Sequence, residues 1–455
     1  MKLLKEILRT VFVGVCVGII TDAVLLAIFE LENICFGIIR KNPIFLLIFP
    51  PLGALIVGSI IWRKNLIKAH AWGPGLDITA EEILNDKPPP IPGKSLLLKA
   101  FAQIIGIGLC NSGGLVGPAG RIGHLFSCLI FKKLSPRFSL MAIAAGIGAV
   151  LKAPLGAGIF SVEAIYGKYL YKGKVSIEDI IYAEGAGMLG ALVSLIVFGD
   201  IPIFGINYYI PEMKDYILFP LMGIVGGITS FLFVGYYEWV EKIREKIKIR
   251  KRFLIPLIAS IIIALIAWGT LNLSNGKLFS ITPSHIPLKK EFANNNLFPN
   301  FLGYGLENVL IAKDMELHND KAEIPIGGQK ESFPILLLAL IMLLTAGGKI
   351  IANGTYVGAG GSGGMIGPAL ITGALTGGGF FLLLYHLGIA QGRQKILFMA
   401  LGATSTLAGT VSAPIGCAIF TFELFGLSAF GPALISTFIA DLITDSYLRK
   451  KREEL

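Results

Sequence analysis

Three segments rich in glycine and proline are the parts of the sequence whose composition points most directly to chemistry. They occupy residues 73–76, 113–120 and 358–368. Each precedes an apolar stretch, so each is predicted to end an extended loop and to begin a helix. The first turn of a helix has backbone N–H groups without partners and carries about half a positive charge. Because glycine lets the backbone approach an ion closely, several such helix starts directed at one point predict an anion-binding site that needs no lysine or arginine.

The elements that position these segments are predicted to be membrane helices. The chain has 455 residues, of which 54% are hydrophobic and 15% charged, whereas a soluble domain has about 25% charged residues. Nearly uninterrupted apolar stretches occupy residues 11–31, 217–237, 253–271 and 335–344. A helix needs about 20 apolar residues to cross a bilayer, and shorter stretches indicate re-entrant pieces. We therefore predict an all-α polytopic membrane protein with broken, re-entrant helices, and we exclude a soluble enzyme.

Charge and cysteine usage fit the same class. Most of the surplus behind the net charge of +10 falls in short basic loops, such as residues 242–252, and carries no aromatic pattern that would bind nucleic acid. This is typical of the positive-inside rule, and it predicts a multi-pass protein of the cell membrane with both termini in the cytoplasm. The apolar N-terminal segment is predicted to be the first membrane helix and not a signal peptide. The five cysteines and five histidines lack metal-site spacing, so no metal and no cofactor is expected.

Four pairs of segments match one another in the same order along the chain, which indicates an internal duplication. They pair residues 14–21 with 223–229, 72–77 with 302–307, 113–118 with 363–368, and 152–163 with 412–423. We predict one repeat over residues 1–206 and another over 207–448, with an extramembrane insertion at 272–331 and a short basic tail at 449–455. The loop at 61–70 is basic and its counterpart is nearly charge-balanced, so the repeats are predicted to be inverted. Inverted repeats place a binding site near the bilayer midplane.

With these features in place, the chain resembles the CLC family of chloride channels and proton-coupled anion exchangers. The family signatures G-S-G-I-P, G-K/R-E-G-P and G-x-F-x-P resemble residues 73–77 (G-P-G-L-D), 114–118 (G-L-V-G-P) and 364–368 (G-M-I-G-P). Lys99 and Lys349 lie where the family carries basic residues, and Tyr447 is similar in position to its pore tyrosine. The alternative for Tyr447 is an aromatic anchor at the membrane interface. The alternative for a single glycine-rich segment is close helix packing, but recurrence across the duplication favours the anion site.

The resemblance implies a homodimer in membrane lipid, in which each inverted-repeat subunit has its own pathway for chloride or another small monovalent anion. It also implies an anion-binding set, which comprises Pro74, Gly75, Val116, Gly117, Met365, Ile366 and Tyr447. The amides of Val116, Gly117, Met365 and Ile366 would face the ion, with the Tyr447 hydroxyl on the inner side. Since the chain stops soon after Tyr447, no cytoplasmic nucleotide-binding module is expected.

Three departures from the family pattern are informative. Val116 stands at the position of the gating glutamate, and Ala164 stands at the position of the proton-accepting glutamate. Proton coupling needs an ionisable relay through the membrane, so these two apolar residues favour passive flow. Pro74 replaces a serine whose hydroxyl binds chloride, and proline here is associated in the family with nitrate preference. Glu163 and Glu423 occupy symmetric positions and are predicted to satisfy helix ends or to pack at an interface, and not to carry protons.

The sequence thus favours a passive chloride channel or uniporter, with nitrate as a second permeant anion, and no enzymatic activity. One alternative is a proton-coupled exchanger that uses another acid, such as Glu163, as its relay. A further alternative is an intramembrane enzyme, which is disfavoured because His124 and His386 have no acid-rich or cysteine motif beside them. A non-conducting remnant with a structural role is the remaining alternative. A conducting site must release its ion, and backbone dipoles without a formal charge suit that requirement.

Overall fold

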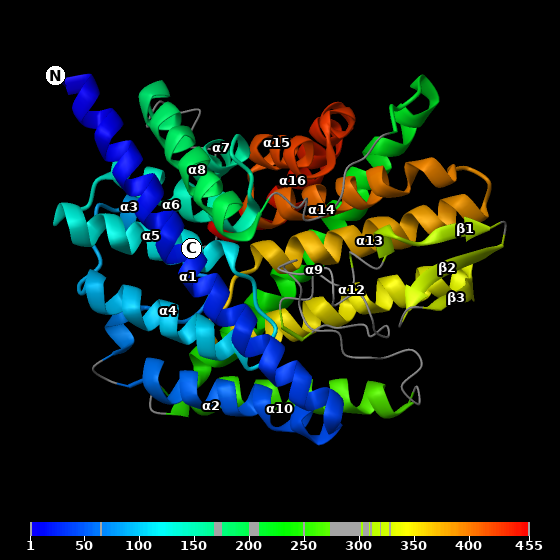
Figure 1. The fold of residues 1–455 in the computed structure, drawn as a ribbon, viewed down its shortest axis with the longest axis horizontal. Helices are drawn as coiled ribbons and strands as arrows, with labels where there is room; N and C mark the ends of the chain where they lie inside the picture. Colours follow the sequence, from blue (N-terminus) through cyan, green and yellow to red (C-terminus); the bar gives the residue numbers. More distant parts are fainter. Residues whose placement is uncertain are drawn as a thin grey trace.

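The structure is a computed structural model that describes residues 2–63, 66–167, 175–199, 209–248, 251–273, 302–303, 309, 312–318, 320–326 and 329–453. It consists mainly of α-helices, many of which run roughly along the longest axis of the molecule (Figure 1). Within these ranges, seven helical segments are long and apolar enough to cross a membrane, and several apolar helices are shorter. The predicted class, a polytopic helical membrane protein with broken helices, is confirmed.

The helices of the first half of the chain differ widely in length. They are α1 (Lys2–Lys41), α2 (Phe49–Ile61), α3 (Leu76–Leu84), α4 (Pro92–Gly108), α5 (Val116–Phe131), α6 (Pro136–Leu151), α7 (Gly156–Tyr166) and α8 (Ile177–Phe198). The expected first membrane helix is the 40-residue α1, which packs against α4, α6 and α8. By contrast, α3 has nine residues and α7 has eleven, so neither can cross a bilayer alone.

The second half repeats much of this order. Its helices are α9 (Leu218–Lys246), α10 (Leu254–Leu273), α12 (Ile335–Gly358), α13 (Ile366–His386), α14 (Lys395–Val411), α15 (Pro414–Phe425) and α16 (Phe430–Glu453). The four predicted apolar stretches coincide with parts of α1, α9, α10 and α12, and the second and third each begin one residue before their helix. Helices at matching positions in the two halves contact each other. These contacts join α2 to α10, α5 to α13 and α7 to α15.

Matching glycines make matching helix contacts in the two halves. Gly14 of α1 lies against α8, where an added Cβ would be 2.7 Å from the Cβ of Leu189. Gly223 of α9 lies against α16, where an added Cβ would be 2.8 Å from the Cβ of Ile439. Small residues let membrane helices approach this closely. The two glycine motifs therefore serve helix packing, and the agreement between the halves supports the duplication.

A small antiparallel sheet precedes α12, and the all-α prediction did not include it. Its strands, in the order β1-β2-β3, are β1 (Glu316–His318), β2 (Lys321–Ile326) and β3 (Gln329–Pro334). In the register, Glu316 pairs with Glu323 and Ile326 pairs with Gln329. The sequence signal was the Gly-Gly pair at 327–328 between two short segments, which is a hairpin signature. The expected insertion at 272–331 thus contains β-structure in its described part, and the third strand extends to Pro334.

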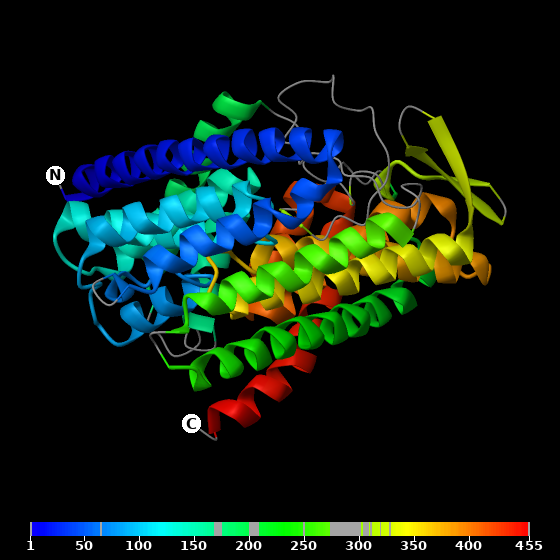
Figure 2. The ribbon, with the colours of Figure 1, turned by 90° about the horizontal axis from the view of Figure 1, so that it is seen from below.

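Only some of the predicted repeat boundaries fall on residues that the structure describes. The expected boundary at residues 206 and 207 lies outside the described residues, so the division into 1–206 and 207–448 stays a prediction. Residues 449–453, which were expected to belong to a short tail, continue α16 without a break. The C-terminal end of this helix projects beyond the neighbouring helices (Figure 2).

Candidate anion-binding site

The three predicted helix starts are present in the structure. Helix α3 begins at Leu76, α5 at Val116 and α13 at Ile366, each directly after a glycine-rich loop. These loops are hydrogen-bonded to one another. The Gly73 N–H donates to the Gly361 carbonyl oxygen at 2.8 Å, and Gly114 and Gly364 exchange two hydrogen bonds of 2.8 and 2.7 Å. Three helix N-termini that are distant in the sequence are therefore joined through their loops.

The contact between Gly114 and Gly364 requires glycine on both sides. A Cβ at Gly114 would lie 2.8 Å from the Gly364 carbonyl oxygen and 2.5 Å from Cδ of Pro368. A Cβ at Gly364 would lie 2.8 Å from Cδ of Pro118 and 3.1 Å from the Gly114 carbonyl oxygen. Both prolines lie in the first turn of their helix, where a backbone N–H has no intrahelical partner. The matched Gly-x-x-Gly-Pro segments thus form a symmetric contact between the two repeats.

The first turns of α5 and α13 carry the backbone donors that were expected to face the ion. The N–H groups of Val116, Gly117, Met365 and Ile366 have no hydrogen-bond acceptor within the described part of the chain. The Val116 side chain is completely buried, and that of Ile366 is buried as well. Met365 is the residue that precedes α13, and it is partly buried. These donors lie at the positive ends of two helices whose preceding loops are bonded to each other.

The residues before α3 lie close to α5. A Cβ at Gly117 would be 3.3 Å from the Pro74 carbonyl oxygen, so Pro74 and Gly117 are neighbours. Gly75 has a φ of +89°, a conformation that glycine adopts without strain. Its N–H donates to Oδ1 of Asp77 at 3.0 Å, so this amide already has an acceptor within the protein, and the place of Gly75 in the anion-binding set stays a prediction. Sequence reasoning gave Asp77 no role, although an acid in the first turn of a helix is a known stabilising feature.

Two buried lysines hold the backbone of the loops. Lys99 is fully buried, and its Nζ donates to the Gly73 carbonyl oxygen at 2.6 Å and to Oγ of Ser362 at 3.2 Å. Lys349 is equally buried, and its Nζ donates to the Gly303 carbonyl oxygen at 2.7 Å. Lys99 and Lys349 match in the duplication, as do Gly73 and Gly303. Each repeat therefore uses one lysine to hold the matching loop carbonyl oxygen.

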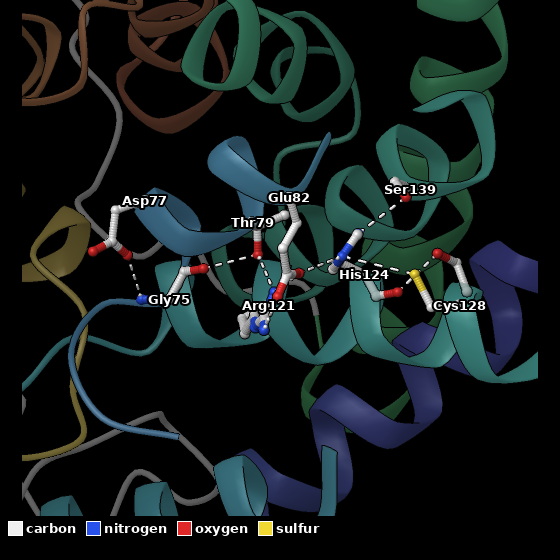
Figure 3. A network of polar contacts seen from close by, with 9 residues as sticks. Gly75, Asp77, Thr79, Glu82, Arg121, His124, Cys128 and Ser139 are labelled. Carbon is white, nitrogen blue, oxygen red and sulfur yellow. Dashed lines mark hydrogen bonds and ion pairs between the residues drawn. The ribbon is translucent and has the colours of Figure 1, made fainter. Parts of the chain in front are cut away.

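A polar network that begins at the Gly75 carbonyl oxygen connects α3 to α5 (Figure 3). Arg121 of α5 is 1% exposed and binds both carboxylate oxygens of Glu82, with 2.9 Å between Nη2 and Oε1. Its Nη1 also donates to Oγ1 of Thr79 at 3.1 Å, and that hydroxyl donates to the Gly75 carbonyl oxygen at 2.8 Å. His124 Nε2 lies 3.0 Å from Glu82 Oε2. An ion pair between the buried Arg121 and the partly buried Glu82 thus links α3 to α5.

Sequence reasoning missed this network. It considered His124 only as a component of an enzyme site, and the structure places that ring between Glu82 and Oγ of Ser139, 3.0 Å from Nδ1. His386 lies at the C-terminal end of α13, well away from the helix starts in sequence. The available signal was Arg121 itself, because an arginine inside an apolar membrane segment needs a partner.

The two glutamates of the duplicated A-P-x-G segments cap each other's helices. Glu163 of α7 accepts hydrogen bonds from the N–H groups of Ile415 (3.3 Å) and Gly416 (2.6 Å) at the start of α15. Glu423 of α15 accepts from the N–H groups of Leu155 and Gly156 at the start of α7. The prediction that these residues satisfy helix ends is confirmed. Ala164 follows Glu163 within α7 and is partly buried.

Tyr447 stays outside the part of the site that can be described. It lies within α16, which runs unbroken to Glu453, and its side chain is outside the described residues. Its predicted role as a hydroxyl ligand therefore stays a prediction.

One group of potential metal ligands is found among the described residues, and it lies on the sheet. Nε2 of His318 is 3.9 Å from a carboxylate oxygen of Glu316 and 3.8 Å from one of Glu323. Lys330 Nζ is 2.5 Å from Glu316 Oε2, so one of the two carboxylates already has a cationic partner. The group is remote in sequence from the helix starts and contributes no ligand to them.

Comparisons with known proteins agree with the architecture. The family model described as "Voltage gated chloride channel" matches residues 53–445. An uncharacterised protein of Methanocaldococcus jannaschii is 24% identical over 378 residues, which cover 82% of this chain and 80% of that protein. A slow cyanobacterial Cl−/H+ antiporter superposes with a TM-score of 0.75 at 14% identity, covering 97% of this chain and 94% of its own.

Two further solved structures share the fold. A CLC-type fluoride/proton antiporter gives a TM-score of 0.70 at 16% identity, and the match covers 98% of this chain and 96% of that one. A eukaryotic CLC transporter gives a TM-score of 0.70 at 18% identity, with 98% of this chain and 72% of that one covered. The family match spans most of the chain and includes all three glycine-rich helix starts. This protein belongs to the voltage-gated chloride channel (CLC) family.

Proposed function

We propose that this protein lets chloride, and also nitrate, cross a membrane passively through a site formed by the N-termini of α3, α5 and α13. Membership of the CLC family supports anion transport. The observation that carries the proposal is the set of unpaired N–H groups at Val116, Gly117, Met365 and Ile366, beside the bonded loops. Such donors stabilise a small anion with partial charges alone, which lets it leave again.

Passive flow is supported by the residues that a proton would need. Val116 is the first residue of α5, and it is buried and cannot ionise. Ala164 likewise offers no carboxylate in α7. The neighbouring Glu163 is engaged by two backbone N–H groups of α15. A proton path through this region would therefore have no carboxylate at position 116 or 164, and membrane proton relays depend on ionisable groups.

Proton-coupled exchange is the second candidate, and two observations favour it. Two of the similar structures are described as a Cl−/H+ antiporter and a fluoride/proton antiporter. Two carboxylates also lie at α7. Glu163 is buried within that helix, and the partly buried Glu184 of α8 accepts the Ile159 N–H at 3.0 Å. If the protein exchanges, these acids are the candidates for its relay.

Anion efflux from liposomes distinguishes the two candidates. Purified protein is reconstituted in vesicles loaded with chloride or nitrate, a potential is set with valinomycin, and the anion and external pH are recorded together. We expect anion release without proton movement. Proton uptake driven by an anion gradient would contradict passive flow, and its loss in Glu163→Gln would identify the relay. Absence of flux for every anion would contradict both candidates.

The membrane arrangement is part of the proposal. Both ends of the chain lie in the half of the long axis opposite to the sheet, which supports termini on one side of the membrane (Figures 1 and 2). We place that side in the cytoplasm, because of the positive-inside rule. We also propose a homodimer in the cell membrane, each subunit with its own pathway. Cross-linking of the protein in native membranes would give a species of twice the subunit mass.

A further inference from the structure

Arg244, near the C-terminal end of α9, is a buried cation with unpaired hydrogen-bond donors. The residue is 4% exposed. Its Nη2 lies 2.7 Å from Oε1 of Glu241 and 3.9 Å from Glu245. Its other two nitrogen atoms, Nε and Nη1, are buried and have no hydrogen-bond acceptor among the residues that the structure describes. A buried donor without a partner costs about 1–3 kcal/mol, and more when it is charged.

The guanidinium lies against the loop that leads to α13. Gly360 has a φ of +96°, and a Cβ there would be 3.2 Å from Cδ of Arg244 and 2.6 Å from the Trp62 ring. The Trp62 indole N–H donates to the Gly360 carbonyl oxygen at 3.3 Å, and Arg244 sits 5.8 Å from the centre of a Trp62 ring. The next residue, Gly361, is the one whose carbonyl oxygen accepts from the N–H of Gly73.

The same face of α9 also meets the loop that leads to α3. Tyr237 lies two turns before Arg244, and its hydroxyl is 3.9 Å from the position of a Cβ at Gly73. That hydroxyl donates to Oε1 of Glu241 at 3.4 Å. Tyr237, Glu241, Arg244 and Trp62, which we call the mouth cluster, therefore connect the basic end of α9 to the loops before two of the three helix starts.

We propose that Arg244 binds a small monovalent anion at the mouth of the pathway, in series with the site at the helix N-termini. This inference rests on the proposed function, and it adds a side-chain site to a backbone one. Among the described residues, Glu241 and Glu245 are the acids close to Arg244, Arg252 lies 5.8 Å from the Trp62 ring as well, and Asp77 acts electrostatically on Glu241. Two sites in series, each binding weakly, are the arrangement that lets ions pass in succession.

The burial of Arg244 sets how the anion arrives. Since the residue is 4% exposed, an anion reaches its free donors by displacing a neighbouring side chain. The Glu241 side chain is 29% exposed and occupies only Nη2. Its negative charge opposes an incoming anion, so neutral Gln at position 241 is expected to strengthen binding, whereas loss of Arg244 weakens it. Opposite effects from two adjacent side chains cannot both come from misfolding.

Bromide is the probe for the test, because its anomalous X-ray scattering marks its position. Crystals of the full chain grown in bromide are expected to show a peak in hydrogen-bond contact with the Arg244 guanidinium. Arg244→Gln should lose this peak and Glu241→Gln should strengthen it. The matched control is Arg252→Gln, since Arg252 lies as far from Trp62 but donates to the carbonyl oxygens of Ile247 and Glu245. The control should retain the peak.

Flux measurements test whether the site lies in series. In liposomes, Arg244→Gln is expected to raise the half-saturating chloride concentration by roughly fivefold, while Arg252→Gln leaves it unchanged. No bromide at Arg244 in the unmodified protein, or a peak that persists in Arg244→Gln, would overturn the inference. An unchanged half-saturation in Arg244→Gln would overturn the serial arrangement. Failure of the proposed function is recognised separately, as absence of flux in the unmodified protein whether or not bromide binds Arg244.

Discussion

At the scale of single residues, the site is defined by where carboxylates are present and where they are missing. Val116 is a buried apolar residue at the first position of α5, so the positive end of that helix has no acid of its own. Asp77, in contrast, holds its carboxylate on the N–H of Gly75 at the start of α3. One helix start therefore has no carboxylate beside it, while another is already shared with a fixed negative charge.

Introducing an acid at the open position should gate the flow. In Val116→Glu, the new carboxylate is expected to compete with the anion for the α5 N-terminus. Efflux should fall about tenfold at neutral pH, which corresponds to roughly 1.4 kcal/mol of competition. Acidification protonates the carboxyl and removes its charge, so efflux should recover as the pH falls. Val116→Gln is the uncharged control of equal size, and a pH-independent loss shared by both variants would contradict competition.

Removing the fixed charge at α3 should have the opposite sign. Asn at position 77 keeps an oxygen acceptor for the Gly75 N–H but carries no charge, so chloride efflux in Asp77→Asn is expected to increase. A charge near a helix terminus is worth about 0.3–1 kcal/mol, which predicts a gain of about two- to fivefold. Initial efflux rates at low chloride concentration measure it. Asp86→Asn, just beyond the other end of α3, is the control and should leave the rate unchanged.

At the scale of elements, the relative placement of α3 and α5 depends on a buried ion pair. Arg121 is 1% exposed, and Glu82 is 12% exposed. Neither short helix spans the membrane, so their own length does not fix where their N-termini lie. The pair contributes positional accuracy at the site, because its side chains connect the two helices within two turns of their starts.

Breaking this pair from one side should be worse than removing it altogether. Arg121→Gln leaves the Glu82 charge buried without its partner, and loss of one member of a buried pair destabilises a protein by about 3–5 kcal/mol. The double variant Arg121→Gln with Glu82→Gln should recover part of this loss, with a coupling energy of about 1–3 kcal/mol. Thermal unfolding in detergent measures all three variants. Strict additivity would show that the pair does not act as a unit.

Sequence patterns predicted elements better than they predicted side-chain partners. The helix starts at Leu76, Val116 and Ile366 follow from glycine and proline, whose backbone preferences are local properties. The roles of Glu163 and Glu423 followed from the symmetry of the duplication. Contacts between distant residues depend on which helix faces meet in space, and no local pattern encodes that. Examples are the contact of Arg121 with Glu82 and that of Arg244 with Gly360. The sheet from Glu316 to Pro334 was missed because a long polar insertion was treated as uniform.

At the scale of the whole molecule, the two repeats are joined by matching contacts. The caps from Glu163 to α15 and from Glu423 to α7 are one such pair. The two hydrogen bonds between Gly114 and Gly364 are another. Each repeat completes the other, so neither half has all of its helix ends satisfied when taken alone.

The reciprocal caps should contribute to global stability. Glu163→Gln and Glu423→Gln each replace a charged acceptor by a neutral one, and each is expected to lower the free energy of unfolding by about 1–2 kcal/mol. The unfolding temperature in detergent measures the change, and the transport mode should not alter. Glu178→Gln is the control, because Glu178 is 71% exposed in its ion pair with Arg137 and surface pairs contribute little. Equal effects at all three positions would argue against a capping role.

The hydrogen bonds between Gly114 and Gly364 also bear on when the candidate site can form during synthesis. The two glycines belong to different halves of the chain, so a ribosome has made most of the protein before the second one exists. Contacts between segments so distant in sequence form late, because the entropy cost of closing a long loop comes before the contacts can stabilise the fold. The first half therefore enters the membrane with its glycine loop unpaired, and the pairing can form only after Gly364 has been synthesised. A chain that ends before α13 lacks Gly364 and cannot make this pairing, so we expect it to form no anion pathway.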